Sequence, residues 1–550
     1  MDSSWQRSAP VFRTQPEKGN EENTKSVLIE EIKPSITPST PQELTQGGSC
    51  TSSVSATAKT FDDSHANPTE ADELIVDWDG PDDPHNPRKS LDDIQEMGGD
   101  SCRVSFISSI SSSMVAPAAE QISQEFSIHS GVTLSMVVSC YVLAYAVGPL
   151  VLSPLSEVYG RSRVLQIANL FFLAFNLACG FAQNTSQLAV FRFLSGLGGS
   201  APLSVGGGTL SDMFAAEDRG KAISIYSVAP LVGPAIGPIA GAFIAQTTTW
   251  RWVFWSSTIA DGIVQLFGLW FLQETYPPVL LERKAAKIRK QMDSEKRLYT
   301  SFRTVYQSKG GRSWEEPFTE ALIRPFILFA QEPIIQLFGL YLALSYGTVY
   351  LTITTLPQIY STVYHEKISI VGLHYLALGL GFSLTSQINS RLLDRVYVYY
   401  KDKNGGVGKP EYRLPVSIPV SLGLPIGLLI AGWGARENVH WIVPDIGFVL
   451  IAAGIVAAFQ AMQTYIVDAF TLYAASALAA VSCFRSLAGF AFPLFAPNMY
   501  QALGYGKGNT ILAAISFVLG PPTLWLFWKY GERIRNMSKR AKDVRVAPMK

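Results

Sequence analysis

The stretch Pro230–Ile244, PLVGPAIGPIAGAFI, decides the fold that we expect for this chain of 550 residues. It lies in a run without charge, residues 222–245, which is long enough to cross a bilayer, since about 20 residues are needed. Glycines that recur at every fourth position share one helix face and let a neighbouring backbone approach closely. They are Gly233, Gly237 and Gly241. Three prolines with the same spacing each remove a backbone hydrogen bond and bend or loosen the helix. They are Pro230, Pro234 and Pro238.

The composition extends this interpretation to the whole chain. Hydrophobic residues make up 48% of it, charged residues only 16%, and the formal net charge is zero. Several uncharged segments follow one another, which predicts an all-α polytopic protein in a lipid bilayer. A neutral chain is not expected to bind nucleic acid, which needs a basic face. The five cysteines are scattered and predict neither a metal site nor a disulfide framework. They are Cys50, Cys102, Cys140, Cys179 and Cys483.

Apolar segments divide the chain into parts. Residues 1 to about 73 are rich in Ser, Thr, Pro, Glu and Gln, so we expect a disordered start and no cleaved signal peptide. The predicted parts are a disordered cytosolic tail (1–100), an N-terminal six-helix half (101–272), a cytosolic central loop (273–328), a C-terminal six-helix half (329–529) and a cytosolic tail (530–550). Eleven spanning helices are expected near 132–153, 163–182, 187–210, 222–246, 251–272, 329–356, 368–390, 414–434, 440–466, 473–497 and 509–529.

A twelfth helix, the first in the chain, is atypical. Only Ser105–Ala119 is compatible with a membrane, and it is too short to span comfortably. Residues 88–104 before it are polar. Two hypotheses remain: a gene-model or splice error in 88–104, or a shortened first helix that leaves the protein active or inactive. Sequencing the transcript across this region decides between them.

Basic residues set the expected orientation. They concentrate in the loops after the second, fourth and eighth helices, in the central loop and in the C-terminal tail, which predicts that both termini and the central loop are cytosolic. The opposite side carries few basic residues: Arg251, Lys367, Arg436 and Lys507. This topology places the sequon at Asn184, a candidate glycosylation site, outside the cell.

Two loops carry related charged motifs. SPLSEVYGRSR, Ser153–Arg163, predicts a tight turn at Gly160 with charges at the membrane surface, and SRLLDR, Ser390–Arg395, follows the eighth helix. The candidate latch residues are Glu157, Gly160, Arg161, Arg163, Asp394 and Arg395. Simple anchoring by positive charge is the alternative. The recurrence in each half favours two halves related by a pseudo-repeat.

Ionisable side chains inside apolar segments are candidates for function, because a charge there is costly. The candidates for proton coupling or substrate binding are Arg192, Asp261, His374 and Arg485. Asp261 lies in the middle of its span and is the best candidate for a proton carrier, with a structural buried acid as the alternative. An imidazole such as His374 titrates in the range a proton relay needs, but a structural role is the alternative. Tyrosines on inward faces are weaker candidates: Tyr141, Tyr145, Tyr226, Tyr346 and Tyr350.

These motifs together resemble the major facilitator superfamily, and in particular its fungal twelve-helix drug:proton antiporters. Pro230–Ile244 resembles the antiporter motif of exporters, carried here by Gly233, Pro234, Gly237, Pro238 and Gly241. LIVDWDGPDDPHNP, Leu74–Pro87, resembles the signature before the first helix. Arg192 lies in a stretch similar to the fourth-helix motif, whose arginine is tied to proton coupling. Ser153–Arg163 is similar to the loop signature that latches helix ends, although Ser153 replaces the usual Gly and Glu157 the usual Asp.

The resemblance implies proton-coupled efflux of drugs, xenobiotics or secondary metabolites. The alternatives are proton-coupled uptake of polyamines or other nutrients, and a non-transporting sensor. Neither an ATP-binding loop nor a histidine cluster occurs, so we expect no enzyme activity, cofactor or metal. The expected partners are a small-molecule substrate, protons and the lipid bilayer, and we expect a monomer. The plasma membrane is the expected location, with the vacuolar membrane as the alternative.

Overall fold

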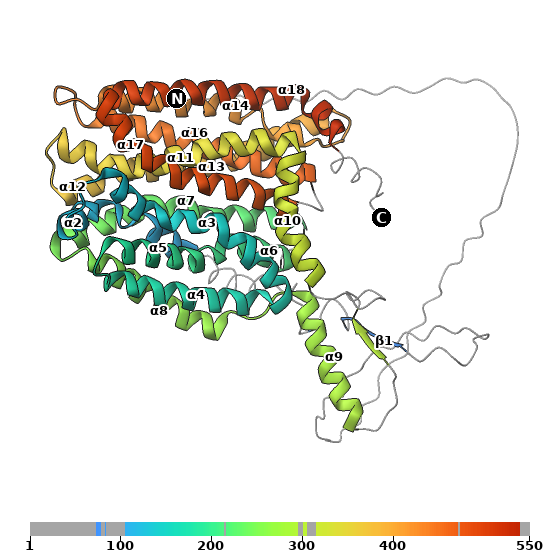
Figure 1. Cartoon of the computed structure of the whole chain (residues 1–550). Coiled ribbons are helices and arrows are strands. Elements are labelled where there is room, and N and C mark those ends of the chain that lie inside the picture. Colours follow the sequence, from blue (N-terminus) through green and yellow to red (C-terminus); the bar gives the residue numbers. More distant parts are fainter. Residues whose placement is uncertain are drawn as a thin grey trace, which may run out of the picture. The chain divides into compact units, whose positions relative to one another are not determined.

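The computed structural model describes residues 73–78, 83, 105–213, 216–294, 301–304, 315–470 and 474–538. Residues 88–104, on which the two hypotheses for the first helix depend, lie outside the described residues. From residue 105 onward the chain is mostly helical (Figure 1).

The helices of the N-terminal half begin with residues 105–113. A turn then leads into the short 3-10 helix η1 (Ala116–Ala118) and helix α2 (Ala119–Glu125). The longer helices follow: α3 (Gly131–Tyr159), α4 (Arg161–Gly180), α5 (Thr185–Gly199), α6 (Ala201–Met213), α7 (Ala216–Thr247) and α8 (Arg251–Phe271).

The central connection and the C-terminal half contain the remaining elements. The connection holds α9 (Pro277–Ser294), strand β2 (Ser301–Thr304) and the start of α10 (Glu315–Gln331). The other elements are α11 (Pro333–Thr362), α12 (Ile368–Leu373), α13 (Tyr375–Lys403), η2 (Pro410–Arg413), α14 (Ser417–Ser421), α15 (Gly423–Gly434), α16 (Ile442–Phe470), α17 (Ala474–Leu519) and α18 (Pro521–Met537).

Eight helical stretches within the described ranges are long and apolar enough to cross a membrane. This confirms the all-α polytopic fold expected from the sequence. The boundaries differ from prediction where the backbone breaks inside an expected span. The last expected span, 509–529, is interrupted at Gly520, because Pro521 and Pro522 cannot donate the backbone hydrogen bonds that would continue α17. Helix α17 itself is broken at Gly504, whose positive φ of 73° suits glycine.

Within the described residues there is a small parallel sheet that the sequence did not predict. Strand β1 (Glu73–Val76) pairs with β2, with Glu73 opposite Ser301 and Val76 opposite Thr304. Strand β1 lies in the segment 1–100 that was expected to be disordered. Lys284 of α9 holds the same region, because its Nζ lies 2.9 Å from Asp83 Oδ2 and donates to Asp77 O at 3.1 Å.

The glycine face of α7 packs against the first helical segment. A Cβ on Gly233 would lie 2.5 Å from Ser109 Cβ, one on Gly237 would overlap Ile110 O, and one on Gly241 would overlap Met114 O. The three prolines lie inside one uninterrupted helix. The glycines at every fourth position therefore let the backbone of α7 pack closely against residues 109–114.

The two halves contact each other mainly where α3 packs against α17 and where α7 packs against α12 and α13. A Cβ on Gly131 of α3 would lie 3.0 Å from Pro497 Cβ of α17. At the α7 contact, Ser369 N donates to Gln246 Oε1 at 2.8 Å. The contact also extends along the helices, since a Cβ on Gly489 of α17 would lie 3.0 Å from Val142 of α3.

Candidate functional site

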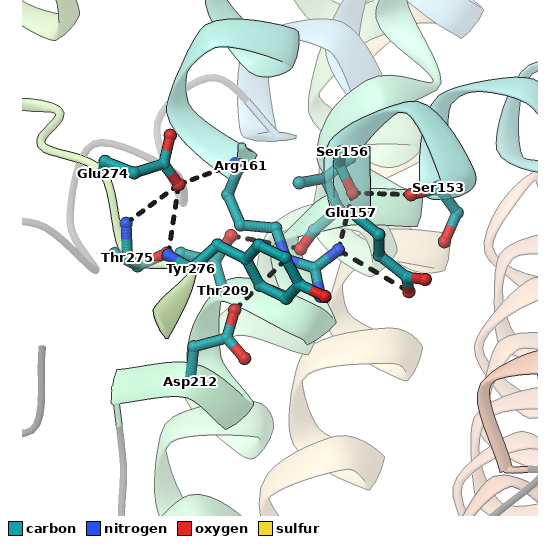
Figure 2. A network of polar contacts seen from close by, with 10 residues as sticks. Ser153, Ser156, Glu157, Arg161, Thr209, Asp212, Glu274, Thr275 and Tyr276 are labelled. Carbon is teal, nitrogen blue, oxygen red and sulfur yellow. Dashed lines mark hydrogen bonds and ion pairs between the residues drawn. The ribbon is translucent and has the colours of Figure 1, made fainter. Parts of the chain in front are cut away.

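Arg161 lies at the centre of a polar network at the start of α4 (Figure 2). Its Nε donates to Asp212 Oδ2 at 3.1 Å, and its Nη1 donates to Ser156 Oγ at 2.6 Å. Glu157 lies at the limit of an ion pair, 4.0 Å away, and is half exposed. Burial raises the pKa of Asp212, and the charge of Arg161 offsets only part of that rise. The pair thus joins the end of α6 to the start of α4.

Gly160 permits a second arm of this network. Its φ of 99° is a conformation that side chains rarely adopt, and a Cβ there would overlap the Glu274 carboxylate. Glu274 Oε1 accepts from the backbone N of Arg161 at 2.8 Å and from those of Thr275 and Tyr276 at 3.1 Å each. The carboxylate therefore ties the turn before α4 to the segment that leaves α8 (Figure 2).

The C-terminal half holds a related cluster around Arg413. Its Nε lies 3.1 Å from Asp468 Oδ2, and its Nη1 lies 2.9 Å from Asp394 Oδ1. Its guanidinium stands 4.4 Å from the centre of the Tyr397 ring. Of the residues predicted for the latch, the structure brings Glu157, Gly160 and Arg161 together in one half and places Asp394 in the other. Arg163 and Arg395 are exposed, and no hydrogen bond or ion pair reaches either from the described residues.

Arg192 is completely enclosed in the N-terminal half. Its guanidinium donates to the carbonyl oxygens of Ser111, Ser112 and Val138, each at 3.0 Å. The Tyr141 and Phe254 rings flank it, with centroids at 4.8 and 5.8 Å. Within the described ranges no carboxylate pairs with it. Arg192 therefore joins the first helical segment, α3 and α5 through backbone acceptors, and its side chain is fully buried.

Asp261 is also fully buried, on the inward face of α8. Within the described part of the chain, neither carboxylate oxygen has a hydrogen-bond partner. The neighbouring polar contacts are made by other side chains: Asn169 Nδ2 donates to Gln265 Oε1 at 2.8 Å. Asp261 and Arg192 do not form an ion pair, and Tyr141 interacts electrostatically with both. An acid and a base thus share the interior of one half without direct contact.

His374 lies between α12 and α13 and is clamped by two carboxylates. Its Nδ1 lies 2.8 Å from Asp445 Oδ2, and its Nε2 lies 2.8 Å from Glu366 Oε2. Because carboxylates only accept, both ring nitrogens act as donors when both acids are ionised. Tyr360 stacks on the ring and donates to Asp445 Oδ1 at 2.6 Å. This cluster joins the ends of α11, α13 and α16.

Arg485 of α17 lies over the Tyr346 ring at 4.5 Å and near that of Phe459 at 5.3 Å. Its Nη2 donates to Ser482 Oγ at 3.0 Å, and its buried Nε has no partner. Of the four predicted candidates, Arg192 and Asp261 thus lie in the N-terminal half, whereas His374 and Arg485 lie in two separate places in the C-terminal half. Asn184 caps α5 through Oδ1, which accepts from Gln187 N at 2.9 Å, and its side chain is exposed.

Several partners of these residues were not predicted. Asp212, Glu274 and Arg413 bond the latch residues, and Glu366 and Asp445 hold His374. Each of these five lies close to a helix end. Charged residues are common at helix ends, so the sequence alone does not single these five out. What distinguishes them is contact with a charged residue from a distant segment, which the structure shows. Asp445 could have been recognised from the sequence, because it is an ionisable residue inside the expected span 440–466.

Comparisons with known proteins agree with this architecture. The family model described as Major Facilitator Superfamily matches residues 103–493. Among similar sequences, Efflux pump vrtL of Penicillium aethiopicum is 44% identical over 482 residues, covering 88% of this chain and 93% of that protein. Uncharacterized transporter C1529.01 of Schizosaccharomyces pombe is 40% identical over 470 residues, covering 85% and 94%. Efflux pump radE of Floropilus chiversii is 39% identical over 477 residues, covering 85% and 86%.

Solved structures support the same fold at low sequence identity. The proton:xylose symporter XylE matches with a TM-score of 0.59 and 14% identity, covering 80% of this chain and 96% of that one. The human organic anion transporter MFSD10 matches with a TM-score of 0.55 and 17% identity, covering 78% and 99%. Because the family model covers most of the chain and fungal relatives match along most of their length, this protein is a membrane transporter that belongs to the major facilitator superfamily.

Proposed function

We propose that this transporter exports small organic compounds in exchange for protons across the plasma membrane, by alternating access of its two halves. The observation that carries the proposal is the Asp261 carboxyl group. It is fully buried and none of its oxygens meets a partner in the described residues. An ionised carboxylate in such surroundings is strongly destabilised, and we take this group as the one that accepts and releases the coupled proton.

A proton carrier must release its proton when the surroundings become wet or positively charged. Asp261 lies on α8, and α8 packs against α4. Movement between these helices would change the exposure of the carboxyl group. Arg192 lies 4.8 Å from the centre of the Tyr141 ring and would stabilise the ionised acid if the two approached. The proposal is that this change of surroundings couples proton entry to substrate exit.

The export direction draws support from two relatives that are named efflux pumps and from the glycine–proline pattern of α7. Uptake of polyamines or other nutrients and a sensor without transport are the competing functions. No specific contact in the described residues favours either of them. They are therefore treated as outcomes of the test.

The test uses the purified full chain in liposomes that enclose a pH-sensitive dye. A panel of aromatic acids, azoles, dyes and polyamines is added under an imposed proton gradient, and substrate and proton fluxes are followed together. We expect substrate movement opposite to proton movement, lost with an uncoupler and reduced at least about tenfold in Asp261→Asn. The control is Asp402→Asn, an exposed acid at the end of α13. Fluxes in the same direction would support uptake, and unchanged coupling in Asp261→Asn would overturn the role of this acid.

A further inference from the structure

Four tyrosines from two helices meet where the halves face each other. Tyr141 and Tyr145 of α3 have ring centroids 5.3 Å apart, and Tyr346 and Tyr350 of α11 have centroids 5.1 Å apart. We call these residues the tyrosine cluster. Two serines of the first helical segment bond its hydroxyl groups. Ser108 Oγ lies 3.0 Å from Tyr141 OH and 2.9 Å from Tyr145 OH, and Ser112 Oγ lies 3.3 Å from Tyr350 OH.

Arg485 borders this cluster through Tyr346. In the described residues, its guanidinium makes one hydrogen bond, to Ser482, three residues earlier on the same helix. Its Nε is buried without a partner, and no carboxylate in the described ranges lies within ion-pair distance. A charge inside a membrane bundle normally pairs with an opposite charge or with backbone acceptors. In the described residues Arg485 therefore has no counter-ion, although it lies inside the helix bundle.

Arg192 provides an internal comparison, because it is a second arginine flanked by two aromatic rings. Its Nη1 and Nη2 donate to three carbonyl oxygens, its buried Nε has no partner in the described residues, and the side chain is 0% exposed. By contrast, Arg485, Tyr346 and Phe459 are all partly exposed. Arg192 is therefore enclosed and held by three acceptors, whereas Arg485 has one side-chain acceptor in the described residues and is partly exposed.

We propose that Arg485 and the tyrosine cluster bind the substrate, and that this substrate is a planar aromatic compound with a carboxylate or another acidic group. The guanidinium would supply the counter-charge through its planar fork of N–H donors. Tyr346 and its neighbours would stack on the aromatic rings. A cationic compound would meet an unpaired positive charge here and no carboxylate to balance it. The inference rests on the proposed export function, because it names the substrate class of that same transporter.

The test measures equilibrium binding to the full chain in lipid nanodiscs, with no proton gradient. The probes are anthracene carboxylate and the matching anthracene carboxamide, which share shape and aromatic area and differ in charge. We expect the carboxylate to bind about tenfold more tightly, or better, because a charge-assisted pair forms only with the acid. Arg485→Gln should remove this preference, while leaving the affinity for the carboxamide within about twofold. Arg485→Lys should keep part of the preference, since it keeps the charge but loses the fork.

The matched control is Arg436→Gln. Arg436 also stands over an aromatic ring, 4.9 Å from that of Trp433, but it is exposed at the end of α15. This variant should bind both probes as the unaltered protein does. Equal binding of the two probes, binding of neither, or a preference that survives in Arg485→Gln would each overturn the proposal. Because no gradient is applied, this result is independent of whether Asp261→Asn abolishes proton coupling.

Discussion

Arg161 Nε and Asp212 Oδ2 lie 3.1 Å apart, and Arg413 Nε and Asp468 Oδ2 repeat this ion pair in the other half at the same distance. In each pair the arginine lies close to the start of one membrane segment, and the acid lies close to the end of the next. The repetition indicates that both halves hold neighbouring helix ends together in the same way. It extends the pseudo-repeat from the loop motifs to their partners.

Loss of the Arg161 charge should destabilise the protein. In Arg161→Ala the buried Asp212 carboxylate loses its cation, which costs about 3 kcal/mol at neutral pH. We expect a lower thermal midpoint and a transport rate at least about fivefold lower. Because burial already raises the pKa of Asp212, the unpaired acid takes up a proton more readily in the folded state. The deficit should therefore shrink as the pH falls. Thermal unfolding at several pH values measures this.

The control for that variant is Arg163→Ala, two residues along the same helix. Arg163 is exposed and has no partner in the described residues. Its removal should change the midpoint by no more than the effect of one surface charge. Equal deficits in the two variants would contradict a specific role for Arg161.

The glycine face of α7 should tolerate no side chain at its centre. A Cβ at Gly237 would overlap Ile110 O and would lie 2.7 Å from Ser113 Oγ. Gly237→Ala should therefore force α7 and the first segment apart, at a cost of about 1–3 kcal/mol, and reduce transport. Gly207→Ala is the control, since nothing lies within 4 Å of its Cβ position. The measurement is the initial transport rate, normalised to the amount of protein at the membrane. Full activity of both variants would refute the packing argument.

The His374 cluster should depend on its central cation. In His374→Gln, Glu366 and Asp445 lose the group that bonds both, and two acids then face each other near a helix junction. We expect a loss of about 2–3 kcal/mol, measured as a fall of several degrees in the thermal midpoint. Adding Glu366→Gln should restore part of it by removing one charge. His440→Gln, which alters an exposed histidine, should have little effect.

Glu125 lies at the opposite end of the bundle from Arg161, and it should make the stability of the fold depend on pH. Its carboxylate accepts from Trp250 Nε1 at 2.6 Å and from Arg251 Nη1 at 2.7–2.8 Å. Partial burial raises the pKa of Glu125, but these bonds and the charge of Arg251 outweigh it, so the pKa lies below its usual value of 4.5. A lowered pKa stabilises the fold above that value, and the gain disappears as the pH falls through the lowered pKa.

Glu125→Gln should therefore lower the thermal midpoint at pH 7, and its effect should shrink as the pH falls below 4.5. Because the side chain is 42% exposed, solvent screening limits the contribution to less than about 1 kcal/mol. A difference between the two proteins that grows on acidification would contradict the assignment. Glu120→Gln, on the same short helix, serves as the control.

The helices could be predicted because bilayer thickness imposes a long apolar run on each of them. The interruptions at Ser200 and His374 could not be predicted, because they depend on packing and not on local composition. Among the candidate residues, the buried positions of Arg192 and Asp261 follow from their place within apolar segments. The partners of His374 and Arg161 come from segments distant in sequence, and one sequence gives no measure of which distant residues meet.

The pairing of β1 with β2 has a consequence for the covalent chain. One strand precedes the first helix of the N-terminal half and the other follows its last, so the sheet brings the beginning and the end of that half together. A break of the backbone between Ser294 and Ser301 would separate the chain into two polypeptides that still share this sheet. The protein should therefore be suited to complementation by coexpressed fragments divided at that position.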